Sequence, residues 1–295
     1  MRKRCGEARV SRRRVNRNYF IPVEDDGLLS YDIGRWADDK YRHVGMYAEM
    51  FATGMKNHWD SRVYIDLFSG PGYSQLRGTT RYYLGSPLIA LSLPNPFDRY
   101  IVSDENERAV AALRSRVSSR WPGADVRYVI KDANESLSDV ASHLPDTGSV
   151  LCFCFLDPYK LNIAFETVRG LATRRNIDFL ILLALYVDAN RNVERYVSDE
   201  SEVIDQFLGD RDWRDRWAVQ IRQGNSFVPF LADEYSTRMR SLGYLPMALE
   251  DMVKVRTSEK RLPLYYLAFY SRHPLGLQFW KEVRKYSTDQ LDLAI

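Results

Sequence analysis

The stretch Tyr-Ile-Asp-Leu-Phe-Ser-Gly-Pro-Gly at residues 64–72 constrains the fold of this chain more than any other part of its sequence. An apolar strand, an acidic residue and a turn with two glycines, in this order, are typical of the opening of a nucleotide-binding βα unit, because glycine lets the backbone approach a ligand over the strand end. The dinucleotide pattern G-x-G-x-x-G is not met, since Gly70 and Gly72 are followed by Gln75. No lysine follows at the spacing of a phosphate-binding loop, so a pyrophosphate site is disfavoured.

A short G-x-G turn after an acidic residue fits better the S-adenosylmethionine (SAM) site of class I methyltransferases. In that site the cationic amino acid end of the cofactor lies beside the turn and carries no phosphate. A tight strand-to-helix turn without a ligand explains these residues equally well if they are taken alone. We predict cofactor contacts at Asp66, Phe68, Ser69, Gly70 and Gly72, and the rest of the chain has to support them.

The length of 295 residues allows one large domain, which we place at residues 35–295 with a helical insertion at about 198–243. Residues 1–34 form a basic arm, in which lysines and arginines crowd the first twenty positions against one acid, Glu7. Such an arm can bind phosphates, although partial disorder in solvent explains its composition more simply.

The sequence gives no sign of a membrane segment, a disulfide framework or a metal site. No apolar run reaches membrane-spanning length, and no apolar segment of a secretion signal follows the basic arm. Cys5, Cys152 and Cys154 lack the C-x-x-C spacing of a zinc site and are too few for a disulfide framework. We expect a cytoplasmic protein without a bound metal, and the composition does not indicate an oligomeric state.

From residue 63 onward, strand patterns alternate with helix patterns, which predicts an α/β fold with a mostly parallel sheet covered on both faces. Strands are expected at 63–68, 99–103, 125–131, 149–156 and 178–184, and helices at 36–59, 86–93, 105–120, 135–143 and 163–173. Closing strands within 245–256 and 264–270, and a helix at 274–286, fit the Rossmann-like class I methyltransferase sheet with its antiparallel terminal strand.

Three local expectations accompany this pattern. Residues 21–34 should be irregular, because acids and glycines there do not favour regular structure. Ser86 before Pro87 predicts a capping hydroxyl at a helix start. In the helix at 36–59, Lys40 is expected on the charged face, opposite the aromatic residues.

Acidic residues follow the second and third predicted strands at their carboxyl ends. Asp104, the first residue past the second strand, can accept hydrogen bonds from both ribose hydroxyls of an adenosine ligand, and Glu105 is the alternative. Asp132 can accept from the adenine amino group, while a neighbouring backbone N–H, at Ala133, donates to the ring. Each acid, taken alone, fits a helix cap as well.

The fourth strand is a fully apolar run, as a central buried strand should be, and it ends in Asp157-Pro158-Tyr159. This ending resembles the [D/N]-P-P-[Y/F] signature of amino-group methyltransferases, in which the acid or amide and a proline carbonyl accept the two N–H bonds of an exocyclic amine and the aromatic ring stacks on the base. We therefore predict catalytic roles for Asp157, Pro158 and Tyr159. The chain has one proline where the signature has two, which displaces the aromatic residue by one position. The Pro-Cys nucleophile of cytosine C5 methyltransferases is absent.

Two segments at the same sheet edge carry candidate substrate contacts. One is the insertion at 73–85, which delays the helix after the glycine turn, and the other follows the fifth strand. Ordinary surface explains the insertion equally well. The segment at 198–243, rich in tryptophan and arginine, suits either a cap over the substrate site or a partner interface. The candidate substrate contacts are Arg77, Arg81, Asn190, Arg191 and Asn192.

A set of motifs stands in order along the chain from about Asp26 to the last helix. They are Trp36-Ala37 with Lys40, the stretch at 64–72, Gly85-Ser86-Pro87, Phe155-Leu156-Asp157-Pro158-Tyr159, Asn190-Arg191-Asn192, Ser271-Arg272-His273-Pro274 and Phe279-Trp280. Together they resemble the three-Cys-motif partner protein (TcmP) family. The resemblance implies a class I methyltransferase-like fold and a gene that often lies beside a radical-SAM-like protein with a three-cysteine motif. It implies no settled reaction, so it bears on the fold more than on the function.

The leading hypothesis is a SAM-dependent methyltransferase that acts on an amino group of a nucleic-acid base. It depends on the acidic strand ends Asp66, Asp104 and Asp132, which appear in order before Asp157. Asp157 would orient the amine lone pair toward the methyl sulfonium, so that catalysis is mainly positioning. One alternative is a partner of the radical-SAM-like three-Cys-motif protein, with the same fold and little or no catalysis of its own. Another is a small-molecule methyltransferase with a closed apolar pocket.

Overall fold

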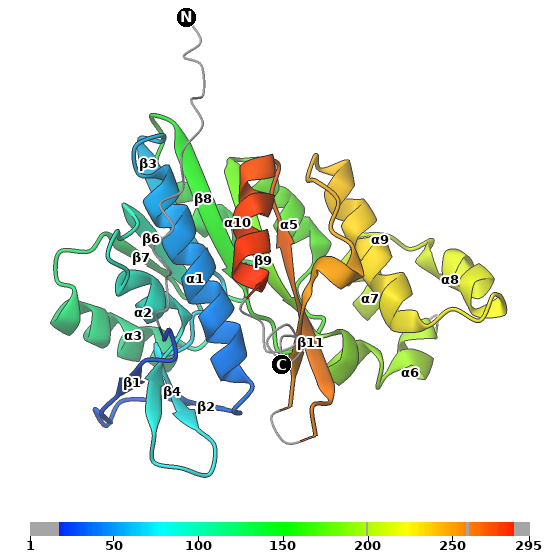
Figure 1. Ribbon diagram of the computed structural model, residues 1–295, viewed down its shortest axis with the longest axis horizontal. Coiled ribbons are helices and arrows are strands. Elements are labelled where there is room, and N and C mark those ends of the chain that lie inside the picture. Colours follow the sequence, from blue (N-terminus) through cyan, green and yellow to red (C-terminus); the bar gives the residue numbers. More distant parts are fainter. Residues whose placement is uncertain (1–17, 199, 258–259, 286–295) are drawn as a thin grey trace, which may run out of the picture.

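The computed structural model describes residues 18–198, 200–257 and 260–285. Its core is a seven-stranded sheet. The strands are β3 (Ser61–Asp66), β6 (Arg99–Ser103), β7 (Val126–Val129), β8 (Val150–Leu156), β9 (Asn176–Leu183), β10 (Val253–Arg256) and β11 (Pro263–Tyr270). They lie in the order β10-β11-β9-β8-β3-β6-β7 (Figure 1).

The pairing of these strands confirms the predicted fold class. Neighbouring strands from β7 to β9 run parallel, and β11 runs antiparallel to both β9 and β10. The strand order reverses between β3 and β8, because β6 and β7 extend the sheet on one side and β8 and β9 on the other. Open α/β sheets bind ligands at the carboxyl ends of the strands beside such a reversal.

Helices cover both faces of the sheet. They are α1 (Ala37–Met55), α2 (Ser86–Leu91), α3 (Glu107–Arg120), α4 (Leu137–Ser142), α5 (Phe165–Ala172) and α10 (Pro274–Arg284). In Figure 1, α1 and α10 pack together in front of the sheet and α5 lies behind it. On the central strand, Phe153 contacts Tyr47 of α1 with ring centroids 5.0 Å apart, whereas Cys152 and Cys154 alternate to the other face and are fully buried. These two cysteines are therefore core residues.

The segment between β9 and β10 is helical. It contains a π-helical turn (Leu185–Ala189), α6 (Val193–Val197), α7 (Val203–Leu208), α8 (Trp213–Arg222), α9 (Phe227–Ser241) and a 3-10 turn (Leu249–Asp251). In Figure 1, α8 extends to the right, away from the sheet. None of the helices in the described ranges is both long and apolar enough to cross a membrane.

A second, four-stranded sheet joins the start of the described chain to the insertion after the glycine turn. Its strands are β1 (Pro22–Val23), β2 (Tyr31–Ile33), β4 (Tyr73–Leu76) and β5 (Tyr82–Leu84), in the order β1-β5-β4-β2. The expectation of irregular structure at 21–34 is therefore wrong at β1 and β2. Both strands are very short and pair only with the distant β4–β5 hairpin, so no local alternation of apolar residues marks them.

The start of α2 differs by one residue from its prediction. Gly85 is the N-cap and Ser86 is the first helical residue, so Ser86 does not cap the helix. Its hydroxyl donates instead to Asp66 Oδ2 at 2.7 Å. The Asp66 carboxylate accepts the hydroxyl proton and so orients the Ser86 side chain toward the end of β3.

Arg116 of α3 ties the small sheet to the main sheet. This side chain is almost fully buried, and it donates to both carboxylate oxygens of Asp26, at 2.6 and 2.8 Å. It also donates to the carbonyls of Leu29 and Pro71, at 2.8 and 2.6 Å, and lies over the ring of Tyr73. One guanidinium therefore binds the segment before β2, the glycine turn and the start of β4 to each other.

We predict that Arg116→Met lowers the free energy of unfolding by about 3 kcal/mol, because the substitution leaves Asp26 and two carbonyls without their donor. Urea denaturation followed by circular dichroism measures the change. Arg127→Met is the matched control, since Arg127 forms an exposed ion pair with Asp125 and its loss should cost at most about 1 kcal/mol. Equal losses in the two variants would contradict the anchoring role of Arg116.

Candidate active site

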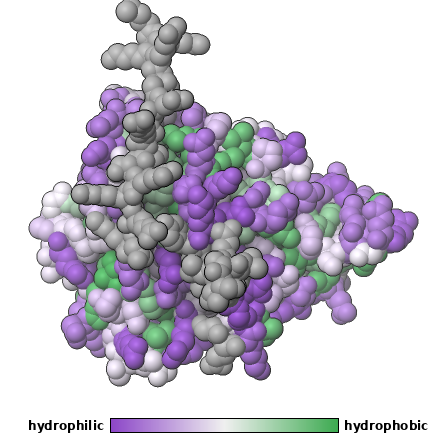
Figure 2. Space-filling view, viewed as in Figure 1, coloured by the Kyte–Doolittle hydropathy of each residue, from purple (hydrophilic) through white to green (hydrophobic). Residues whose placement is uncertain are grey.

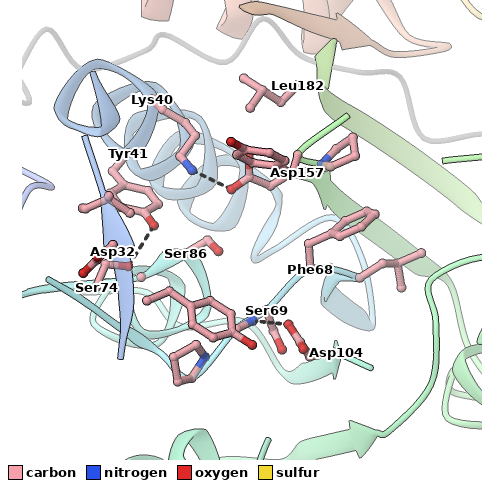
Figure 3. Close-up of a pocket in the computed structure, with 18 of the residues that line it drawn as sticks. Asp32, Lys40, Tyr41, Phe68, Ser69, Ser74, Ser86, Asp104, Asp157 and Leu182 are labelled. Carbon is pink, nitrogen blue, oxygen red and sulfur yellow. Dashed lines mark hydrogen bonds and ion pairs between the residues drawn. The ribbon is translucent and has the colours of Figure 1, made fainter. Parts of the chain in front are cut away.

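A cavity of about 470 Å³ opens at the carboxyl ends of β3, β6, β7 and β8 (Figure 3). The glycine turn, the start of α1, the small sheet and the beginning of β11 complete its walls. Most of the predicted site residues, from distant parts of the sequence, meet there. Those that line the cavity are Phe68, Ser69, Gly70, Gly72, Arg77, Asp104, Asp132, Ala133, Asp157, Pro158 and Tyr159.

The glycine turn needs its glycines for both conformation and packing. Gly70 and Gly72 have φ angles of +57° and +86°, which residues with a side chain rarely adopt. A Cβ atom at Gly72 would also lie 2.8 Å from the side chain of Leu113 on α3. The N–H of Gly70 donates to Asp104 Oδ2 at 2.9 Å, which links the turn to the end of β6. The turn therefore packs against α3 and is hydrogen-bonded to the end of β6.

Asp66 lies behind the cavity wall and does not line the cavity. Its carboxylate is fully buried and accepts hydrogen bonds from the hydroxyls of Ser86 and Tyr64, at 2.7 and 3.1 Å, and from the N–H of Phe68 at 3.1 Å. Burial raises the pKa of Asp66 to about 7, although the bonds from Ser86 and Phe68 oppose the rise. Asp66 therefore stabilises the glycine turn from the core side. Its carboxylate is not placed to contact a ligand in the cavity.

Ser69 offers a polar atom to the cavity. Its Oγ is buried and has no hydrogen-bond partner in the part of the chain that the structure describes. A buried hydroxyl without a partner costs free energy, so such atoms commonly mark a ligand or water position. Because Ser69 belongs to the glycine turn and lines the cavity, this hydroxyl can bond a polar group placed over the turn.

The two acids at the ends of β6 and β7 also face the cavity. Asp104 accepts from the N–H groups of Gly70 and Asn106, and burial raises its pKa. Asn106, not Asp104, caps α3, because its side chain accepts from two N–H groups of the first turn. Asp132 accepts from the N–H of Asn134 at 2.8 Å. Both carboxylates keep lone pairs for a ligand, since a carboxylate can accept about four hydrogen bonds.

Lys40 is a site residue that sequence reasoning placed on the wrong face of its helix. It is almost fully buried, and its Nζ lies 2.5 Å from Asp157 Oδ2 (Figure 3). The ammonium lies 5.0 Å from the ring centroid of Trp36 and 4.5 Å from that of Tyr41. Burial by itself lowers the pKa of Lys40, but the Asp157 carboxylate outweighs burial and holds this pKa above its ordinary value. A signal for Lys40 in the sequence is its place in the motif Trp36-Ala37 with Lys40, which the TcmP resemblance includes.

The predicted substrate contacts divide into two groups. Arg77 lines the cavity from the tip of the β4–β5 hairpin, and Arg81 is exposed on the same tip. The three predicted contacts after β9 do not line the cavity: Asn190 and Arg191 are exposed, and the Asn192 amide donates to Asp188. None of the described residues within 198–243 lines the cavity, so these residues of the helical insertion do not cap it.

No family model matches the sequence, and no curated protein matches it. The fold is similar to several solved structures. A protein from Legionella pneumophila is 11% identical, with a TM-score of 0.47, over 84% of this chain and 92% of that chain. An O-methyltransferase from Bacillus cereus, in complex with SAH, is 12% identical, with a TM-score of 0.45, over 83% and 84%. An rRNA methylase from Streptococcus thermophilus is 8% identical, with a TM-score of 0.39, over 80% and 97%.

We predict that the stability of the protein falls as pH rises from about 4 to about 7, in a way that depends on Asp66. The pKa of this carboxyl is about 7 in the folded protein and 3.8 as its ordinary value, so over this range the folded protein keeps a proton that the unfolded chain has released. In Asp66→Asn the contribution of Asp66 to this dependence disappears, so over this range the difference in unfolding free energy between the wild type and the variant should change by an amount on the order of 4 kcal/mol.

Urea denaturation at a series of pH values measures this difference. Asp233→Asn, at an exposed position on α9, is the control and should keep the slope of the wild type. Parallel profiles for the wild type and Asp66→Asn would show that Asp66 does not titrate in this range.

Proposed function

We propose that this chain is a SAM-dependent methyltransferase that acts on an amino group of a nucleic-acid base. The observation that carries the proposal is the meeting, around one cavity, of the glycine turn, the acids at the ends of β6 and β7, and Asp157-Pro158-Tyr159 at the end of β8. Each of these features is common by itself. Together they lie beside the reversal of strand order, and a sheet of this type binds its ligands there.

The residues of the cavity fit the parts of SAM. Asp104 offers acceptors for the ribose hydroxyls, and Asp132 and Ala133 at the end of β7 lie where an adenine can be held. Ser69, with its unpartnered hydroxyl, and the Gly70 to Gly72 turn lie where the amino acid end of the cofactor belongs in this class of site. The bound cofactor supplies a methyl group on a sulfonium. The protein supplies orientation and excludes water.

The acceptor half of the cavity contains the end of β8. Asp157 has an oxygen, Oδ1, that accepts no hydrogen bond from the described residues, and none of them donates to the Pro158 carbonyl. These two oxygens can accept the two N–H bonds of an exocyclic amine and so direct its lone pair. Tyr159 is 72% exposed beside them, which leaves its ring free to stack on a base.

Two arginines at the mouth of the cavity favour a nucleic acid over other acceptors. Arg77 and Arg81 project from the hairpin tip, and neither forms a side-chain hydrogen bond or ion pair with any other residue in the described ranges. Free guanidinium groups on a hairpin beside the cavity are suited to the phosphates that flank a flipped base. Residues 1–17 of the predicted basic arm lie outside the described residues, and their contribution stays a prediction.

The wild-type protein should bind S-adenosylhomocysteine with one site per chain in isothermal titration calorimetry. Asp104→Asn should weaken this binding about ten-fold, because the amide replaces one of the acceptors for the ribose hydroxyls with a donor. Glu107→Gln, in the exposed first turn of α3, should leave the affinity unchanged. A wild-type protein that binds no S-adenosylhomocysteine would sink the proposal.

Transfer of a labelled methyl group tests the reaction itself. Label from SAM should appear in DNA or RNA, and Asp157→Ala should lower the rate at least about 100-fold, because the variant cannot orient the amine. The same variant should still bind S-adenosylhomocysteine, since Asp157 belongs to the acceptor half of the cavity. Label in a small molecule and in no nucleic acid would favour the small-molecule alternative.

A second candidate function is that of a partner protein for a radical-SAM-like three-Cys-motif protein, as the TcmP resemblance implies. The ion pair with Lys40 favours it, because one oxygen of Asp157 is already engaged. The helix α8 exposes two apolar side chains, Val219 and Ile221, which a partner could cover. The face shown in Figure 2 is largely hydrophilic. Methyl transfer that depends on Asp157 would exclude a role without catalysis.

A further inference from the structure

The Lys40 ammonium has more donors than the protein uses. An ammonium carries three N–H donors, and Nζ makes one hydrogen bond within the described residues, to Asp157 Oδ2 at 2.5 Å. Its other close neighbours are the faces of two rings, at Trp36 and Tyr41, which attract a cation but accept no strong hydrogen bond. Lys40 lines the cavity while its side chain is only 4% exposed. Donors of this kind are expensive to leave unpaired, so a ligand that accepts from them gains affinity.

Asp157 has the complementary property. One of its oxygens is bound to Lys40, and the other accepts nothing from the described residues. The cavity wall therefore presents a hydrogen-bond donor and a hydrogen-bond acceptor side by side, joined by their own ion pair (Figure 3). Rings of Trp36, Tyr41 and Tyr265 surround this pair, which suits a flat ligand.

We infer that Lys40 and Asp157 together recognise the amidine edge of adenine or cytosine, with Asp157 accepting from the exocyclic amino group and Lys40 donating to the adjacent ring nitrogen. This inference rests on the proposed function and names its acceptor. Adenine and cytosine share this edge, in which an amino donor stands beside a ring acceptor. The Watson–Crick edge of guanine places a ring N–H beside its amino group, and this N–H would face the ammonium.

The same pair selects against aliphatic amines. The side chain of a lysine in a protein substrate presents its amine on a flexible chain, without a ring to pack between the aromatic side chains around the pair. An aliphatic amine also has no neighbouring acceptor for Lys40. The ion pair therefore favours a flat amine with an adjacent ring acceptor over an aliphatic amine.

The test uses the full-length protein, labelled SAM, and DNA and RNA oligonucleotides that each contain one target base. The targets are adenine, cytosine, and their analogues 1-deazaadenine and 3-deazacytosine, which keep the amino group but replace the adjacent ring nitrogen with C–H. We expect wild-type transfer to the preferred base to exceed transfer to its deaza analogue about 10- to 100-fold, the value of one hydrogen bond to a charged group. Comparison of the oligonucleotides identifies the base that is methylated and shows whether the substrate is DNA or RNA.

Lys40→Met supplies the second half of the test. The variant should lose a similar factor on the natural base, and its preference over the deaza analogue should fall to about one, because the two changes remove the same hydrogen bond. A loss caused only by altered structure would leave the preference unchanged. Lys160→Met, at an exposed position beside Tyr159, is the control and should keep both rate and preference.

The outcomes separate this inference from the function on which it rests. If the wild type binds no S-adenosylhomocysteine, the proposed function itself fails. If it binds S-adenosylhomocysteine and modifies neither adenine nor cytosine, or modifies the deaza analogue as fast as the natural base, the role of Lys40 is overturned. The analogue comparison needs only the wild type, so the inference stays testable even if Lys40→Met fails to fold.

Discussion

The glycine turn after β3 is the constraint on which the rest of the site depends. Asp66 holds this turn from behind through Ser86 and Phe68, and the carbonyl of Gly72 accepts from the N–H of Gly85 at 2.7 Å. These bonds bring the two ends of the insertion together, so the intervening residues leave the sheet as the β4–β5 hairpin. The position of the hairpin then decides where β1 and β2 can pair and which residues cover the cavity.

The Lys40–Asp157 ion pair is the second organising interaction. Two charges removed from water are unfavourable unless geometry and further hydrogen bonds compensate for their lost hydration, and here some of the hydrogen-bonding capacity stays unused. Such a pair is a poor device for stability alone. It is well suited to a site that must present a donor and an acceptor in a fixed relation to a ligand.

Much of the fold and part of the site could be predicted from local pattern. The five parallel strands were predicted within two residues at each end, because buried parallel strands are continuous apolar runs bounded by turn residues. The same pattern placed Asp104, Asp132 and Asp157 at one sheet edge, since parallel strands end together. The pattern misplaced Lys40, because helical periodicity assigns charged residues to the solvent side and does not register a partner over 100 residues away. It also assigned a capping role to Ser86, whose hydroxyl is held by Asp66.

The sequence by itself determined the sheet, its direction of pairing and the group of polar residues at its carboxyl edge, because these follow from apolar periodicity and from chain connectivity. Tertiary structure decided which of these residues face the cavity. Asp66 is turned into the core, Asn192 is bound to Asp188, and Lys40 is drawn to Asp157. The physical reason is that buried polar atoms need hydrogen-bond partners. Here the partners include residues distant in sequence, and only the folded chain brings them together.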